Sequence, residues 1–189
     1  MLTLKIFNYL RNKLDHGRSA VLCFLLRLLC SKRLKMGKVF IGRHFSFNIS
    51  SKQCQINIGD KVCFRKNATL RVRQGAQLTI GRNVFFNDGL SINCHGIISI
   101  ADDCMFGENV RLYDHNHRFR NNDTPIIKQG FTVGKIAIGR NCWIGSNVVI
   151  LKNVTIGDNV VIGANCLIMA DVPSNTIVKN NIPLTQEAY

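Results

Sequence analysis

Acidic side chains are scarce in this chain of 189 residues. Eleven Asp and Glu stand against twenty-five Lys and Arg, which gives a formal net charge of +14. A balance this positive predicts attraction to an anionic partner, such as a nucleotide cofactor, a membrane surface or nucleic acid, without choosing among them. The hydrophobic content of 46% excludes a disordered chain and is typical of a globular protein.

Two other features are missing. None of the eight cysteines forms a C-x-x-C pair, and we therefore expect reduced thiols and a cytoplasmic protein. The chain also lacks a long hydrophobic run, because the apolar stretch at residues 20–30 is too short to span a bilayer and carries Arg27 in its middle. No convincing cleavable signal is found.

What the chain does contain is a six-residue repeat. Isoleucine recurs at every sixth position at Ile138, Ile144, Ile150, Ile156, Ile162 and Ile168. A second apolar residue follows each isoleucine after four positions, at Cys142, Val148, Val154, Val160, Cys166 and Val172. Six is an even number of strand steps, so both sets can face one interior, whereas a 3.6-residue helix does not fit. The repeat predicts a parallel β-helix in which Cys104, Cys142 and Cys166 fill the core.

The coils can be followed along residues 39–172. Similar opening phrases begin at residues 41, 58, 80, 100, 138 and 156, and three hexads make one triangular coil of roughly eighteen residues. The interval from 100 to 138 is much longer than one coil. We therefore expect a loop, residues 118–134, that leaves the coil after about His117 and returns at Gly134. Loops of this length in a compact repeat are usually functional.

Residues 1–38 differ in kind from the repeat. They hold nine Lys or Arg and one acidic residue, Asp15, with apolar residues at helical spacing. We predict two helices, at about 2–14 and 18–35, broken near Gly17. Two compatible interpretations stay open: a cap over the unpaired end of the β-helix, or a basic amphipathic segment that lies on an anionic membrane. Residues 173–189 are expected to form a short tail.

With this repeat and loop, the chain resembles the hexapeptide-repeat acyltransferases. More narrowly, it resembles the maltose and galactoside O-acetyltransferases and their relatives that acetylate bacterial surface polysaccharides. The resemblance covers about residues 55–183. It implies an all-β fold, a left-handed parallel β-helix with an N-terminal helical segment and a long loop excursion. It also implies a homotrimer and acetyl-CoA as the acyl donor, with no metal.

The resemblance also assigns roles to residues on the acceptor side. The run NVRLYDHNH at residues 109–117 places His117 as the general base. His115 stays an alternative, because residues two apart in an extended segment point the same way. Asp114 or a backbone carbonyl would orient the base. Asn87, within GRNVFFND, matches the asparagine that lines the acceptor-sugar side.

The donor side is assigned in the same way. Trp143 matches the aromatic residue beside the thioester and pantetheine arm, and the backbone N–H of Ser146 matches the oxyanion donor, with Gly145 between them. The candidates for contacts to the cofactor's phosphates are Lys152, Lys179 and the edge residue Arg140. The tail departs from the family pattern, because NIPL at residues 181–184 replaces the usual Gly-x-Pro followed by a basic residue and a helix.

These residue types suit direct acetyl transfer. An imidazole with a pKa near 6.5 can remove the proton of a sugar hydroxyl as it attacks the thioester, and a fixed N–H can stabilise the oxyanion. We expect an O-acetyltransferase in surface-polysaccharide (O-antigen or capsule) biosynthesis, with a sugar or glycan acceptor that could be lipid-linked. Such a protein would be cytoplasmic, with contact between residues 1–38 and the inner face of the membrane left open.

Other functions are weighed against this one. An N-acetyltransferase for an amino sugar or small amine remains an alternative. From another class, a non-catalytic basic scaffold or nucleic-acid-binding protein would explain the charge. However, the basic residues are spread out rather than gathered on one face among exposed aromatics, so we expect no nucleic acid partner. A zinc enzyme of the γ-class carbonic anhydrase type needs two histidines five apart, and His115 and His117 are two apart.

Overall fold

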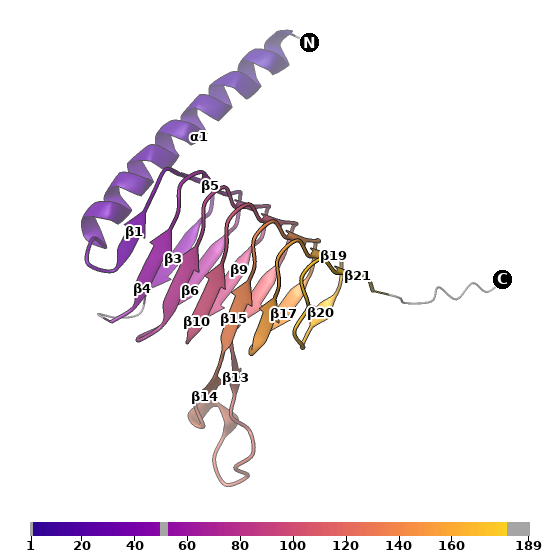
Figure 1. The fold of residues 1–189 in the computed structure, drawn as a ribbon. Coiled ribbons are helices and arrows are strands. Elements are labelled where there is room, and N and C mark those ends of the chain that lie inside the picture. The colour runs from indigo at the N-terminus through magenta and orange to yellow at the C-terminus, as the bar shows by residue number, and fades with distance from the viewer. Residues whose placement is uncertain (1, 50–52, 181–189) are drawn as a thin grey trace, which may run out of the picture.

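The computed structural model describes residues 2–49 and 53–180, with side chains from residue 13 onward. A single helix, α1 (Leu2–Leu29), precedes a stack of short parallel strands, and a hairpin projects from the stack (Figure 1). Each strand has only two to four residues, because a hexad spends the rest of its length on a turn.

The strands form three parallel sheets, which we call faces A, B and C. Face A contains, in spatial order, β1 (Leu34–Met36), β4 (Gln55–Ile58), β7 (Gln77–Ile80), β10 (Ile97–Ile100), β15 (Lys135–Ile138) and β18 (Val154–Ile156). Face B contains β2 (Val39–Ile41), β5 (Val62–Phe64), β8 (Phe85–Phe86), β11 (Met105–Phe106), β16 (Trp143–Ile144), β19 (Val161–Ile162) and β21 (Ile177–Val178). Face C contains β3 (Ser46–Ile49), β6 (Thr69–Val72), β9 (Ser91–Cys94), β12 (Arg111–Tyr113), β17 (Val149–Leu151) and β20 (Leu167–Ile168).

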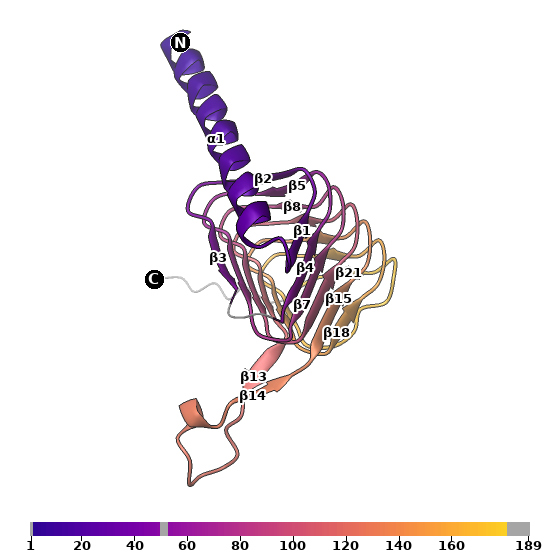
Figure 2. The same cartoon turned by 90° about the vertical axis from the view of Figure 1, so that its left-hand side faces the viewer.

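The chain runs from face A to B to C and then into the next coil, so the prism has three edges, the AB, BC and CA corners (Figure 2). The predicted parallel β-helix is therefore confirmed. Its hexad register is confirmed too, because Ile58, Ile80, Ile100, Ile138 and Ile156 are aligned from one coil to the next. The stacking places equivalent side chains in the interior at every level.

The core consists of these inward ladders. Phe64 and Phe86 are stacked with ring centroids 5.0 Å apart, and Phe106 follows 4.7 Å from Phe86. The three cysteines that were predicted as core filler, Cys104, Cys142 and Cys166, are all buried. Dry, close-packed contacts of this kind supply most of the stability of a repeat fold.

Both ends of the β-helix differ from the prediction. Ile41 pairs with Phe64 on face B, whereas Met36 pairs with Ile58 on face A, so the first coil begins at Leu34 rather than at Val39. A six-residue period repeats on all three faces, and it therefore does not reveal on which face a hexad lies. At the other end, β21 pairs with β19 and begins a further coil within the predicted tail.

The turns at the corners rely on residues that tolerate a left-handed backbone. Asn147 and Asn165 at the BC corner have φ values of 59° and 61°, and the Asn147 amide donates to the Asn165 side chain at 3.1 Å. Asparagine adopts this conformation more readily than other non-glycine residues. Such ladders of amides hold the turns of successive coils in register and fix the positions of the residues beside them.

The N-terminal segment contains one helix instead of the two predicted. Gly17 lies inside α1, where a Cβ would meet nothing within 4 Å. A glycine within a helix costs about 1 kcal/mol relative to alanine, and this is too little to end a helix that packs elsewhere along its length. The prediction of a break at Gly17 was therefore wrong.

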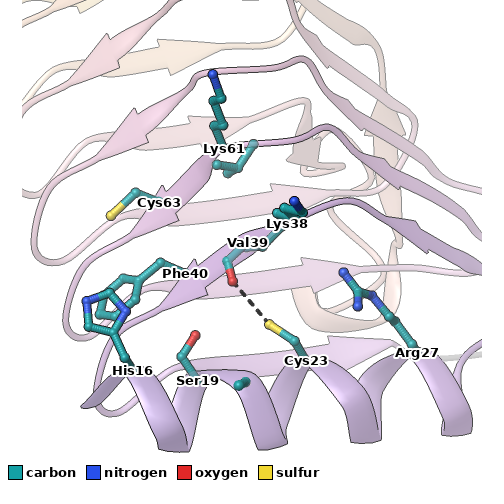
Figure 3. Close-up of a pocket in the computed structure, with 11 residues that line it drawn as sticks. His16, Ser19, Cys23, Arg27, Lys38, Val39, Phe40, Lys61 and Cys63 are labelled. Atoms are coloured by element: carbon teal, nitrogen blue, oxygen red, sulfur yellow. Dashed lines mark hydrogen bonds between the residues drawn. The ribbon is translucent and has the colours of Figure 1, made fainter. Parts of the chain in front are cut away.

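Helix α1 covers the open edge of the first coil, as the cap interpretation predicted. Ile41 N donates to Ser19 Oγ at 2.8 Å, and Arg18 donates to the Ile41 carbonyl at 2.9 Å. The Cys23 thiol donates to the Val39 carbonyl at 3.3 Å (Figure 3). These bonds occupy backbone groups of β2 that have no neighbouring strand on that side.

The outward side of α1 is apolar. Val21, Leu25, Leu28 and Leu29 are exposed there, with Leu29 at 78%. Among the residues that the structure describes, no helix is both long and apolar enough to cross a membrane.

The loop excursion is a hairpin. Strand β13 (His115–His117) pairs antiparallel with β14 (Phe131–Val133), and the 3-10 turn η1 (Ile126–Lys128) lies at the far end. Gly134 N donates to the Asp114 carbonyl at 2.7 Å and closes the root. The excursion thus begins at His115, before the predicted exit after His117, so both histidines stand on the hairpin and outside the coil.

Candidate functional site

A buried carboxylate anchors the hairpin at the CA corner. Asp114 is fully buried, and its side chain accepts the backbone N–H of His95 at 2.8 Å and that of Gly96 at 2.7 Å. Its Oδ1 also lies 3.2 Å from Nδ1 of His115. Asp114 therefore ties two backbone N–H groups of the preceding coil to His115, the first residue of β13, as an orienting residue would.

The imidazoles of His95 and His115 lie on each other. Their ring centroids are 3.3 Å apart and their planes differ by 4°. Phe131 contacts both, edge-on, and its centroid is 4.4 Å from that of His117. Because His115 and His117 both contact Phe131, they lie on the same face of the hairpin, as their spacing predicted.

Electrostatics keeps His95 neutral. Burial lowers its pKa to about 4, and repulsion from His115 and Arg73 acts in the same direction. The Asp114 carboxylate opposes this effect but does not overcome it. The neighbouring Cys94 thiol has a raised pKa, chiefly because it is buried. The corner thus holds a neutral imidazole against His115.

His117 is the accessible histidine. It is exposed and lines a cavity of about 620 Å³ along the hairpin together with Arg118, Thr132 and Lys152. Lys152 comes from the CA corner of the next coil, just after β17. The predicted base and one predicted cofactor-binding lysine therefore lie beside one cavity.

A second set of predicted residues meets at the BC corner. The Asn87 amide donates to the Glu108 carboxylate, and so does the Ser146 hydroxyl. Glu108 N in turn donates to Ser146 Oγ at 3.2 Å. The hydroxyl of Ser146 lowers the pKa of Glu108 below its usual value, so this carboxylate is charged at neutral pH.

Glycines permit the coils to approach closely here. A Cβ on Gly107 would lie 2.6 Å from Ser146 N, and one on Gly145 would lie 2.6 Å from Ala164 N. Any other residue at these positions would push the coils apart. Gly145 and Ser146 therefore belong to a rigid turn, which suits a backbone N–H that must be held in place.

Trp143 lies on face B, between the AB and BC corners. It points outward and is 54% exposed, in a ladder with one outward apolar residue from each coil. The ladder, which we call the face B stripe, consists of Phe40, Cys63, Phe85, Met105, Trp143, Val161 and Ile177.

The remaining cofactor candidates are dispersed. Lys179 follows β21 and therefore lies at the BC corner, where it is exposed. Arg140 lies at the AB corner, where its Nε is 3.2 Å from an Asp158 carboxylate oxygen. Its charge is thus already matched, which makes it a weaker candidate for a phosphate than Lys179.

One chain does not bring all the predicted site residues together. The CA corner holds His115 and His117, and the BC corner holds Asn87 and Ser146. Glu108 and Asp114 are separated by β12, and six residues of extended chain span roughly 20 Å. The two sets stand at opposite edges of face C.

Sequence reasoning did not single out three residues of these corners. No role was assigned to His95, Glu108 or Arg73 from the sequence. Only the coil register could have revealed them, because each comes from a different coil than its partners. In the part of the chain that the structure describes, no three His, Cys, Asp or Glu side chains are grouped to hold a metal ion.

Comparison with known proteins agrees with this scaffold. Residues 135–170 match the family described as Bacterial transferase hexapeptide (six repeats). The coils are hexapeptide repeats. Because the same period continues through the aligned coils that precede this segment, the resemblance inferred from the sequence is confirmed for the scaffold.

Individual relatives are named acetyltransferases. A probable acetyltransferase of Mycobacterium tuberculosis is 28% identical over 109 residues, which cover 58% of this chain and 36% of that protein. A protein of Dictyostelium discoideum named as an acetyltransferase is 34% identical over 96 residues, covering 50% of this chain and 48% of that one. The chain thus spans between a third and a half of the length of these relatives.

Solved structures share the fold. A hexapeptide-repeat acetyltransferase of Vibrio cholerae, crystallised with acetyl coenzyme A, has a TM-score of 0.54 and 25% identity over 90% of this chain and 79% of its own. A variant of AntD, an N-acyltransferase of Bacillus cereus crystallised with dTDP and coenzyme A, has a TM-score of 0.57. Its identity is 20% over 77% of this chain and 78% of its own, so it bears on the fold alone.

Proposed function

We propose that this chain is an acetyl-CoA-dependent O-acetyltransferase for a sugar hydroxyl, in the biosynthesis of a surface polysaccharide such as O-antigen or capsule. The observation that carries the proposal is the histidine-bearing hairpin at the point where a hexapeptide scaffold interrupts its repeat. The likeness to acetyltransferases, one of them with acetyl coenzyme A bound, supports the donor.

His117 is the base in this proposal, because its ring is exposed whereas that of His115 is covered on one side by His95 and held at Nδ1 by Asp114. The imidazole removes the hydroxyl proton as the oxygen attacks the thioester carbon. The new C–O bond forms, the Ser146 N–H stabilises the oxyanion, and the C–S bond breaks. The imidazolium then returns the proton to the leaving thiolate, so the free thiol of CoA is released.

Two copies of the chain build each site in this proposal. The BC corner of one subunit would face the CA corner of the next, which unites Asn87 and Ser146 with the partner's His117. The face B stripe supports a homotrimer, because seven aligned outward apolar positions are unusual on a surface that stays in water.

The donor would lie along the later coils. Trp143 offers a flat apolar surface for the pantetheine arm, Gly145 and Ser146 offer a rigid turn, and Lys152 and Lys179 offer cations for the phosphates. Backbone N–H groups and lysines are common phosphate ligands.

Membrane contact fits the same reaction. The outward row of α1 is apolar, and Lys13, Lys32 and Lys35 are exposed around it. This combination suits an anionic lipid surface. We therefore place the protein in the cytoplasm at the inner face of the membrane, beside a lipid-linked glycan.

The test is release of the CoA thiol over a panel of sugar and amine acceptors. His117→Ala should lower transfer by at least about a hundredfold and leave the oligomer intact. His44→Asn is the matched control, because His44 has a φ of 55°, a conformation that asparagine tolerates. Near-normal turnover of His117→Ala with loss in His115→Ala would assign the base to His115. Transfer to amines alone would favour the N-acetyltransferase alternative.

A further inference from the structure

The inner side of the hairpin faces a hollow that the reaction outlined above does not use. It has a volume of about 610 Å³ and is lined by Arg73, Gln74, His95, Phe131 and Val133. Phe131 and Val133 are the β14 partners of His117 and His115. The hollow therefore lies next to the face of the hairpin that carries His115 and His117. It is large enough for a sugar ring.

Positive charge gathers around this hollow. The Arg73 guanidinium lies 4.9 Å from the centroid of Phe131 and is exposed. His95 feels repulsion from Arg73, His115 and His117, so all three of these basic groups lie near enough to act on it.

The acid of this corner does not offset that charge in the hollow. Asp114 is fully buried beneath the rings, and its oxygens already accept the N–H groups of His95 and Gly96. A ligand in the hollow would therefore meet a guanidinium and imidazole edges, with the carboxylate covered by its own hydrogen bonds.

We propose that this hollow binds an anionic group of the sugar acceptor, a carboxylate or a phosphate, with Arg73 as its partner. The inference rests on the proposed function and names the substrate class of that site. A guanidinium can hold either oxyanion through two parallel hydrogen bonds. Phe131 and Val133 line the same hollow and provide apolar surface beside the sugar ring.

The position of the hollow relates charge recognition to catalysis. Phe131 contacts His117 with centroids 4.4 Å apart, so a sugar seated on Phe131 presents its hydroxyls to the proposed base. Arg73 would thus act in acceptor binding and leave the chemical step unchanged. This separation gives a kinetic signature, because loss of Arg73 should raise KM for an anionic acceptor and leave kcat nearly unaltered.

The experiment compares three acceptors of one size: a neutral hexose, the corresponding hexuronate and the hexose phosphate. The wild-type protein should prefer one of the anionic acceptors. Arg73→Gln should lower kcat/KM for that acceptor at least about tenfold and change the neutral hexose less than about twofold. The preferred anion distinguishes a carboxylate from a phosphate source.

Arg82→Gln is the matched control. It makes the same charge change at the AB corner, where Arg82 pairs with Asp102 on an exposed edge. It should leave all three acceptors unaffected. An equal loss in Arg82→Gln would assign the effect to net charge and would overturn the inference.

Binding without turnover separates this inference from the proposed function. Saturation-transfer NMR with the hexuronate and the hexose phosphate should give a signal for wild type that Arg73→Gln loses. Such a result supports the anion site even if no acetyl transfer is found, which would refute the proposed function alone. If wild type transfers acetyl equally well to the neutral hexose and Arg73→Gln changes neither binding nor kcat/KM, the anion site does not exist.

Discussion

Replacing Asp114 by asparagine should loosen the hairpin that carries His115 and His117. The substitution keeps the shape of the side chain but turns one acceptor oxygen into an N–H₂ donor. In one orientation the new amide faces Gly96 N, and in the other it faces His95 N and His115 Nδ1. With the amide at the Oδ2 position, Gly96 N loses its acceptor; with the amide at the Oδ1 position, His95 N keeps only its longer bond to Oδ2, at 3.1 Å.

The magnitude follows from that count. A buried donor without an acceptor costs about 1–3 kcal/mol, and bonds to a charged acceptor lie toward the upper end of this range. Asp114→Asn should therefore lower the free energy of unfolding by about 2–3 kcal/mol. Asp114→Ala, which removes both acceptors, should cost roughly twice as much.

Urea denaturation followed by circular dichroism at one protein concentration measures this cost. Asp102→Asn is the control, because Asp102 likewise accepts a backbone N–H, from Arg82 at 2.7 Å, but on an exposed edge where water can replace it. The control should cost less than about 1 kcal/mol. Equal costs for the two variants would refute the anchoring role of Asp114.

Three further predictions concern the core, the pH response and the helix. Phe86→Ala should lower the free energy of unfolding, measured by urea denaturation, by about 3–5 kcal/mol, because it opens a cavity between Phe64 and Phe106. Phe85→Ala, on the outer side of the same strand, should cost far less. Similar costs for the two variants would contradict the role of the inward phenylalanines in the core. The free energy of unfolding should fall as the pH drops from about 6.5 toward 4. In this range His95 is protonated in the unfolded chain but stays neutral in the folded protein, where its pKa is lowered. His95→Gln should flatten that part of the pH profile of the thermal midpoint, and an unchanged profile would assign the effect elsewhere. Finally, the protein should sediment with anionic vesicles and not with neutral ones. The double variant Val21→Asp, Leu28→Asp should weaken this binding at least about tenfold. Unchanged binding of the double variant would show that the apolar row of α1 is not the membrane-binding surface.

The sequence predicted the coil because its period and its chemistry agree. Isoleucines six apart, such as Ile138 and Ile156 three hexads apart, can align only if the chain turns once between them, and this alignment is observed. The same period does not show on which of the three faces a given hexad lies. The phrases that open at residues 41 and 58 predicted that Ile41 would align with Ile58 on face A. Met36 occupies that position instead.

The candidate site was predictable in its members but not in its arrangement. The run at residues 109–117 identified Asp114, His115 and His117, and these are neighbours because they are adjacent in the chain. Contacts between coils, such as His95 on His115, depend on which corner each residue occupies. They become visible only when the strands are aligned, because loop lengths between coils vary.

In the proposed trimer, each active site takes its base from one subunit and its oxyanion turn from the next. The most direct test of this arrangement is co-expression of His117→Ala with a variant in which a substitution of Asn87 abolishes activity. If the two halves come from different chains, random 1:1 assembly should restore about a quarter of all sites, which is about one site in each mixed trimer, although either variant alone is inactive. If the mixture stays as inactive as the single variants while mixed trimers are present, both halves belong to one chain and the account fails.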